Sequence, residues 1–202
     1  MSKKSKMIAA SLIATALTGQ LSGASKAQSA AEFGDAVLNI AQSELQEWIT
    51  DPVIVFAIRE QNQLHAGLNE RRIKRLDKRW VAGGSYGPMV GDLLGRQASV
   101  ILRDRRERSN GLINEIIVMD AFGMNVAISD ATSDFFQGDE AKWLETYLKG
   151  PDAVHIGEIE FDDSTQKDQS QVSLTVTDPE TGTPIGAVTF GIDVGIALAR
   201  GS

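Results

Sequence analysis

The chain has 202 residues, of which 42% are hydrophobic and 23% are charged, and this balance is typical of one soluble domain with a substantial core. Its formal net charge of −7 disfavours a ligand built on a phosphate backbone, so we expect no nucleic-acid partner. The absence of cysteine excludes disulfide bonds and lipid attachment at an N-terminal cysteine, so the core alone must stabilise the fold.

Residues 1–31 predict a secretory signal peptide. Three lysines open the chain, an apolar run of 11 residues follows from Met7 to Leu17, and small residues continue to Ala31. This run is shorter than the roughly 20 residues that span a bilayer, which favours a cleaved signal over a membrane anchor. Cleavage after Ala27 and cleavage after Ala31 both fit the pattern. Loss of the four lysines in this segment leaves 16 basic against 27 acidic residues, a net charge of −11, and we expect the protein in the periplasm.

The next segment, residues 33–108, is predicted to be helical. Apolar residues recur at intervals of three and four from Phe33 to Ile49. Asp51 before Pro52 suits the start of a second helix, whose apolar period continues to Trp80 over about 28 residues. A third helix is predicted at residues 89–102, and a charged segment closes it.

Six basic residues gather near the C-terminal end of the second predicted helix: Arg71, Arg72, Lys74, Arg75, Lys78 and Arg79. Cations at this end favour the helix dipole, and charge runs are most often solvated faces. Binding to an acidic partner or to lipid headgroups is the alternative.

From Leu112 onward the pattern changes to β, after the turn signal Asn110-Gly111. Five strands are predicted, and short links between the last three favour an antiparallel sheet over residues 112–194. The strands are Glu115 to Asp120, Asn125 to Ser129, His155 to Phe161, Gln171 to Thr177 and Ile185 to Val194. We therefore predict one α+β domain over residues 32–202, with long N-terminal helices packed on a five-stranded antiparallel sheet.

One sequence motif occurs twice in the segment that is predicted to form this sheet. Val118-Met119-Asp120-Ala121-Phe122-Gly123 ends a strand in an acid and a glycine turn, and Val176-Thr177-Asp178 through Gly182 repeats this pattern. The strand that follows the second copy reads Pro184-Ile185-Gly186-Ala187-Val188. Their order behind a long helix resembles the extracellular Cache sensor domains, the PAS-like ligand-binding modules of bacterial chemoreceptors and histidine kinases. The resemblance covers roughly Phe33 to Val194. It implies a small-molecule pocket between the sheet and a covering loop, and ligands such as organic acids, amino acids and amines.

The covering loop implied by this resemblance is Asp130 to Lys149. It brings acids, hydroxyls and aromatic residues together, and pockets are commonly built from apolar walls with a few polar groups. We expect polar contacts from Asp130, Thr132, Asp134 and Lys142, and walls from Phe135, Phe136 and Trp143. Trp80 and Tyr86 are further candidates from the helical segment, and the last strand offers Asp193. The alternative is that the aromatic residues are core and the acids are helix caps or solvated.

One pattern favours an enzyme. Gly83-Gly84-Ser85-Tyr86-Gly87 matches the G-x-S-x-G elbow of serine hydrolases, with acids and His155 following in the hydrolase order. That motif requires a strand directly before the serine, whereas a helix is predicted there.

Bound metals and cofactors are not expected. The acids of the covering loop fail the EF-hand spacing that calcium needs, although a chance calcium site is an alternative. His65 and His155 are far apart in the sequence, so a zinc site is not expected, and no phosphate-binding glycine loop is present to indicate a cofactor.

These patterns together predict a periplasmic protein that binds a polar metabolite and presents the bound state to a partner. Loop closure over the ligand would change how the helix from Pro52 to Trp80 docks, and a membrane receptor or sensor kinase would read that change. A homodimer through the N-terminal helices is a further expectation. A serine hydrolase using Ser85 and an interaction module without a ligand remain as alternatives.

Overall fold

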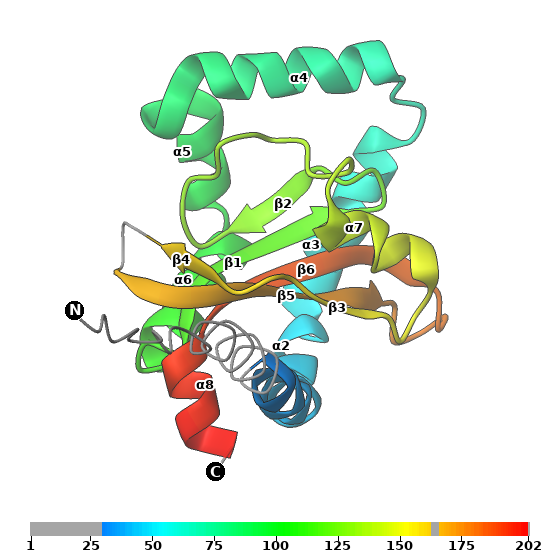
Figure 1. Cartoon of the computed structure of the whole chain (residues 1–202). Coiled ribbons are helices and arrows are strands. Elements are labelled where there is room, and N and C mark those ends of the chain that lie inside the picture. The colour runs from blue at the N-terminus through cyan, green and yellow to red at the C-terminus, as the bar shows by residue number, and fades with distance from the viewer. Residues whose placement is uncertain (1–29, 163–165, 202) are drawn as a thin grey trace, which may run out of the picture.

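The computed structural model of the protein describes residues 30–162 and 166–201 (Figure 1). The predicted signal peptide falls almost entirely on residues 1–29, outside this part of the chain. Within the described ranges, none of the helices combines the length and the apolar character needed to cross a membrane.

The sheet is antiparallel throughout and confirms the predicted α+β class. Its strands are β1 (Ile113–Asp120), β2 (Asn125–Ile128), β3 (Val154–Ile156), β4 (Glu160–Asp162), β5 (Lys167–Thr177) and β6 (Pro184–Asp193). They are ordered β2-β1-β6-β5-β3, and β4 pairs with the remaining part of β5. The single strand predicted from His155 to Phe161 is therefore two short strands. Gly157 lies between them, and its backbone N–H donates to the carbonyl oxygen of Gln171 in β5.

The prediction of one long helix from Pro52 to Trp80 is wrong, because the chain turns between α3 (Pro52–His65) and α4 (Glu70–Gly83). Gly67 has a φ of +86°, which favours glycine, and the side chain of Asn69 caps α4 by accepting from the Arg72 N–H. The predicted start is confirmed, since Asp51 accepts from the Val53 N–H at 2.8 Å. Figure 1 shows α4 crossing the top of the molecule as a separate element.

The remaining helices are mostly short. Residues 30–40 are α-helical and continue through η1 (Ala41–Leu45, a π-helix) into α2 (Gln46–Ile49). The predicted third helix is divided at Arg96, whose backbone is extended. Further elements are η2 (Gly84–Tyr86), α5 (Pro88–Gly95), α6 (Gln97–Arg108), α7 (Ala141–Leu144), η3 (Tyr147–Lys149) and α8 (Val194–Gly201). The last of these was not predicted.

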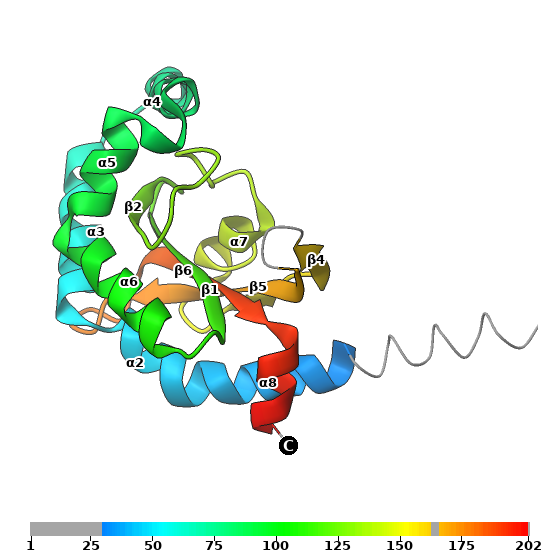
Figure 2. The ribbon, with the colours of Figure 1, turned by 90° about the vertical axis from the view of Figure 1, so that its left-hand side faces the viewer.

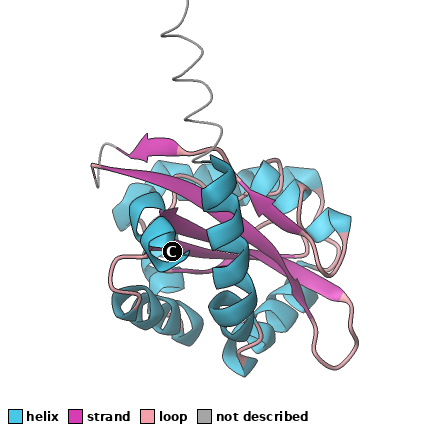
Figure 3. Ribbon diagram, turned by 60° about the horizontal axis from the view of Figure 1, so that its bottom comes forward, coloured by secondary structure: helices cyan, strands magenta, loops and turns pink. Residues whose placement is uncertain are grey.

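The two faces of the sheet are covered differently. Ile116 and Val118 of β1 point into the larger core, with residues from α3, α6, α8 and the helix of residues 30–40. Ile117 and Met119 alternate with them and point to the opposite face, which we call the covered face. There they pack beneath Trp80 and Phe135 in a smaller core. Figure 2 shows α2 and α8 on one side of the sheet and α7 and α4 on the other, and Figure 3 shows helices lying across the strands.

The turn between β1 and β2 depends on Gly123. Its φ is +73°, and a Cβ there would lie 2.3 Å from the Cα of Gly138, which is backbone. Because both the conformation and the space exclude a side chain, we expect Gly123→Ala to lower the free energy of unfolding by about 3 kcal/mol in urea titrations. The matched control is Gly91→Ala in α5, where no atom would lie within 4 Å of the new Cβ. This control should be neutral or slightly stabilising, and equal losses for the two variants would contradict the account.

An ion pair ties α3 to the turn between β5 and β6. Arg59 donates to both carboxylate oxygens of Asp178, at 2.7 and 2.6 Å, and these bonds hold the pKa of Asp178 at about 2. A lowered pKa stabilises the fold above the unfolded value near 3.8, and this contribution is lost as the pH falls toward 2. We expect Arg59→Gln to raise the pKa of Asp178 in an NMR titration and to flatten the pH dependence of stability between pH 4 and 2. An unchanged titration would show that the pair does not form in solution.

Candidate functional site

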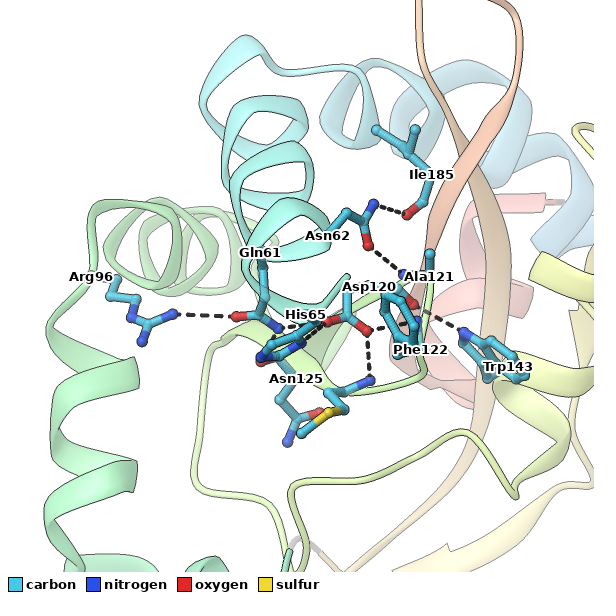
Figure 4. Close-up of polar contacts among 11 residues, drawn as sticks. Gln61, Asn62, His65, Arg96, Asp120, Ala121, Phe122, Asn125, Trp143 and Ile185 are labelled. Carbon is cyan, nitrogen blue, oxygen red and sulfur yellow. Dashed lines mark hydrogen bonds and ion pairs between the residues drawn. The ribbon is translucent and has the colours of Figure 1, made fainter. Parts of the chain in front are cut away.

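A buried carboxylate, Asp120, lies at the end of β1 (Figure 4). It accepts from Gln61 Nε2 at 3.0 Å and from His65 Nδ1 at 2.6 Å, and both donors come from α3. It also accepts from the backbone N–H groups of Phe122 and Met124, at 2.8 and 3.0 Å. One side chain thus joins the last turns of α3 to the β1–β2 turn.

The same turn is joined to the covering segment. Trp143 of α7 donates from Nε1 to the backbone carbonyl oxygen of Asp120 at 3.0 Å. Asn62 of α3 accepts from the Ala121 N–H and donates to the Ile185 carbonyl, both at 2.8 Å. Helix α3, the β1–β2 turn and α7 therefore form one continuous polar connection, as Figure 4 shows.

The first half of the covering loop is held by α4. Trp80 stacks on Phe135 with ring centroids 5.2 Å apart, and its Nε1 donates to the Thr132 carbonyl at 2.9 Å. Asp77 accepts from the N–H groups of Phe135 and Phe136, at 2.9 and 3.1 Å. These contacts place the aromatic residues in the smaller core.

The loop is also joined to β2. The side-chain amide of Asn125 donates to Thr132 Oγ1 at 2.9 Å and to the Asp134 carbonyl at 3.0 Å. The side chain of Gln137 donates to the Asp134 carbonyl at 3.2 Å. The structure therefore brings Trp80, Thr132, Asp134, Phe135 and Phe136 together in a packed cluster.

Beyond this cluster the covered face of the sheet is polar. Val172, Leu174 and Val176 of β5 point into the larger core, so the alternating Gln171, Ser173 and Thr175 point to the covered face. Thr189 of β6 lies beside Ser173, with their hydroxyl oxygens 2.9 Å apart, and both residues are buried. Thr175 Oγ1 is buried, and no residue in the described ranges 30–162 and 166–201 gives it a hydrogen bond. Gln171 donates to Glu115 of β1 at 3.0 Å.

The covering segment over these strands is α7 and η3. Lys142 is buried and donates to Gln137 Oε1, while pairing with Glu140, both at 3.1 Å. Trp143 and Tyr147 stack with ring centroids 5.1 Å apart. Burial raises the pKa of Tyr147, and the negative charge of Asp120 adds to this effect. A buried ammonium group and two aromatic rings thus cover a face of hydroxyl and amide groups.

An acidic pocket opens beside this covered face. It has a volume of about 360 Å³ and is lined by Glu140, Gly157, Glu158, Glu160, Gln169, Ser170 and Gln171. Gln171 also reaches Glu115, and Glu140 pairs with Lys142, so the pocket and the polar face share residues. A larger groove of about 650 Å³ is lined by Ala30, Phe33, Gly34, Ile156, Gly157, Glu158, Ile159 and Asp168.

Three predicted site residues lie elsewhere. Tyr86 is fully exposed on η2, and Asp130 pairs with Arg106. Asp193 pairs with Lys167 at 2.7 Å and caps α8 by accepting from the Ile196 N–H. Burial would raise the pKa of Asp193, but these partners lower it. The structure therefore does not bring these three residues together with the other predicted site residues.

The serine hydrolase alternative requires a strand before Ser85. The structure instead places helix α4 directly before it, and Ser85 lies exposed on a short 3-10 turn. The sheet is antiparallel, whereas the hydrolase elbow rises from a parallel one. Within residues 30–162 and 166–201, no group of three or more acidic or histidine side chains is placed to hold a metal ion.

Two informative features were not predicted. The sequence indicates Asp120 only as a strand end, because nothing local shows that His65, 55 residues earlier, is its partner. The polar face of β5 was also not predicted, although the alternation of Gln171, Ser173 and Thr175 with apolar residues is visible in the sequence.

The sequence matches no known protein family and no curated protein. Several solved structures have a similar fold. The sensor domain of the V. cholerae histidine kinase DctB matches 90% of this chain and 59% of its own, at 14% identity and a TM-score of 0.45. The isoleucine-bound sensory domain of the Campylobacter jejuni chemoreceptor Tlp3 matches 90% and 65%, at 11% identity and 0.39. The E. coli DcuS sensor domain matches 64% and 92%, at 17% identity and 0.36.

These matches are sensor domains, the kind of domain that the sequence resemblance predicted. This chain spans less than two thirds of the DctB and Tlp3 structures. At identities below 25% and TM-scores below 0.5, the likeness concerns the fold alone.

Proposed function

We propose that this protein binds a small metabolite carrying a cationic nitrogen, an amine or an amino acid, and presents the bound state to a partner without chemical turnover. The ligand lies between the polar face of β5 and β6 and the covering α7–η3 segment, with its nitrogen in the acidic pocket. The predicted export signal places this binding in the periplasm.

The observation that supports this proposal best is the polarity of a covered sheet face. Burying hydroxyl and amide groups costs free energy unless each finds a partner, so a face serving only the core would carry apolar residues, as the opposite face does. Ser173, Thr175 and Thr189 instead point into covered space, and Thr175 Oγ1 has no partner among the described residues. A polar ligand would supply one.

The charges of the pocket indicate the ligand class. Glu140, Glu158 and Glu160 line it, and Lys142, which pairs with Glu140, is the neighbouring cation. This excess of carboxylates favours a cationic nitrogen over a free carboxylate. The pocket volume of about 360 Å³ lies within the range of small-molecule sites.

The predicted residues take two roles in this proposal. Lys142 and Trp143 belong to the covering segment and contact the ligand. Trp80, Thr132, Asp134, Phe135 and Phe136 hold the first half of the loop in place. Tyr86, Asp130 and Asp193 have no part in the site.

The polar connection through Asp120 gives the bound state a route to the surface. Ligand contact moves α7, Trp143 transmits the shift to the Asp120 carbonyl, and the Asp120 side chain transmits it to His65 and Gln61 on α3. Helix α3, rather than the long helix expected from the sequence, then presents the state to a membrane receptor or sensor kinase, or to a second copy of the chain.

A thermal-shift screen of amines, amino acids and carboxylates tests this function. A ligand at 100 times its dissociation constant stabilises the fold by about 2.7 kcal/mol, so amines and amino acids should raise the melting temperature. We expect Glu158→Gln with Glu160→Gln to abolish the shift. The control, Glu107→Gln with Glu145→Gln, changes the net charge equally and should retain it. A screen without any shift would favour an interaction module that has no ligand, and a shift only with carboxylates would contradict the ligand class.

A further inference from the structure

Helix α4 is a basic element on an acidic protein. It carries Arg71, Arg72, Lys74, Arg75, Lys78 and Arg79 against two acids, Glu70 and Asp77, while the whole chain has a net charge of −7. Figures 1 and 2 show it as the outermost element at one end of the molecule, opposite the end that carries α2 and α8.

The six cations form one face. At 100° per residue they fall within an arc of roughly 160°, and Ile73, Leu76, Asp77 and Trp80 occupy the opposite arc. All six are exposed. Within the part of the chain that the structure describes, none of the six side chains has an ion-pair or hydrogen-bond partner. The cationic face is therefore solvated and free to meet an anionic surface.

Contacts on the inner side fix the rotation of this helix. Trp80 is buried, stacks on Phe135 and donates to the Thr132 carbonyl, and Asp77 accepts two backbone N–H groups of the loop. Since these contacts hold α4 in one orientation, its six cations point outward without further ordering. Preorganised charges bind at a lower entropic cost.

Apolar side chains lie exposed near both ends of α4. Leu64 in the last turn of α3 is 80% exposed, Val81 is 56% exposed and Tyr86 is fully exposed. Tyrosine is enriched at the level of lipid headgroups, and basic helices with apolar flanks are typical of surface-bound membrane proteins.

We propose that the outer face of α4 is a docking surface for an anionic lipid bilayer. The helix is about 20 Å long, so its charges span several headgroups and exceed what one small anion requires. The fully buried centre of a protein interface is apolar, and an all-cationic strip offers no such centre, which disfavours a protein partner. The acidity of the rest of the chain disfavours nucleic acid. This acidic body also repels an anionic membrane, but α4 lies outermost, and screening over about 8 Å weakens the repulsion of more distant charges.

Vesicle co-sedimentation of the protein tests this inference without any metabolite. Vesicles of phosphatidylcholine with 30% phosphatidylglycerol, at low salt, should bind the protein, and pure phosphatidylcholine vesicles should not. Arg71→Glu with Arg75→Glu should weaken binding at least about thirtyfold, because each cation near an anionic surface contributes roughly fivefold. The control, Arg108→Glu with Lys149→Glu, makes the same change in net charge at exposed sites elsewhere and should bind like the unchanged protein.

The outcomes separate this inference from the proposed function. Equal binding to neutral and anionic vesicles, or equal losses for the two charge-reversal variants, would overturn it. Binding of single-stranded DNA in preference to the anionic vesicles would also overturn it. Because no ligand is present, a failure here leaves the metabolite site untouched, and a failed thermal-shift screen leaves the vesicle result valid.

Discussion

Replacing Asp120 with alanine should lower the free energy of unfolding by about 4 kcal/mol, the largest effect expected from a single polar residue in this chain. The carboxylate is fully buried and accepts hydrogen bonds from Gln61, His65 and two backbone N–H groups. Alanine leaves the His65 ring nitrogen and the two backbone N–H groups without this acceptor, whereas Gln61 keeps its bond to the Asn125 carbonyl oxygen. Each unsatisfied donor costs about 1 kcal/mol or more. Urea unfolding followed by circular dichroism measures the loss.

Two further variants make this result specific. Asp92→Ala removes a carboxylate from an exposed ion pair with Arg96 and should change stability by less than about 0.5 kcal/mol. Asp120→Asn retains one oxygen for the turn but sets an amide against the donors of α3, and it should lose an intermediate amount. If the Asp120→Ala and Asp92→Ala variants were equally stable, Asp120 would not join α3 to the sheet.

Replacing Trp80 with alanine should cost about 4 kcal/mol by removing the largest buried side chain of the smaller core. The cavity term adds to the loss of the stacking on Phe135, and the Thr132 carbonyl loses its donor. The structure also predicts where the effect appears. Hydrogen exchange at the N–H groups of Phe135 and Phe136 should accelerate, because α4 no longer holds the loop.

Tyr86→Ala provides the control for Trp80→Ala. The Tyr86 side chain is fully exposed, so the control should leave both stability and exchange unchanged. Trp80→Phe should restore most of the stability but not the hydrogen bond to Thr132. Fast exchange at Phe135 in the unchanged protein would contradict the anchoring of the loop by α4.

Local signals predicted much of the fold. Asp51-Pro52 begins α3 as expected because a cap and a proline act within a few residues. The apolar period continues past Leu64 through Leu68 to Trp80, so periodicity alone did not reveal the turn at Gly67. The strand alternation placed β1, β2, β5 and β6 correctly, but it did not show that Gly157 divides β3 from β4.

The candidate site was less predictable, because it depends on pairings between distant segments. The acids and aromatic residues of the loop suggested a pocket, yet Phe135 is fixed by Trp80 and Asp77 of a helix more than 50 residues away in the sequence. The polar face depends on which strand neighbours which. Ser173 meets Thr189 only because β5 pairs with β6.

The most direct test of the account is an NMR map of the ligand site. A labelled sample of the protein is titrated with the amine or amino acid that gives the strongest thermal shift. The account predicts the largest chemical-shift changes at Gln171, Ser173, Thr189 and Lys142, with smaller changes along α3. Changes confined to the groove between α3 and α6, around Phe56 and Leu64, with none on β5 and β6, would contradict it.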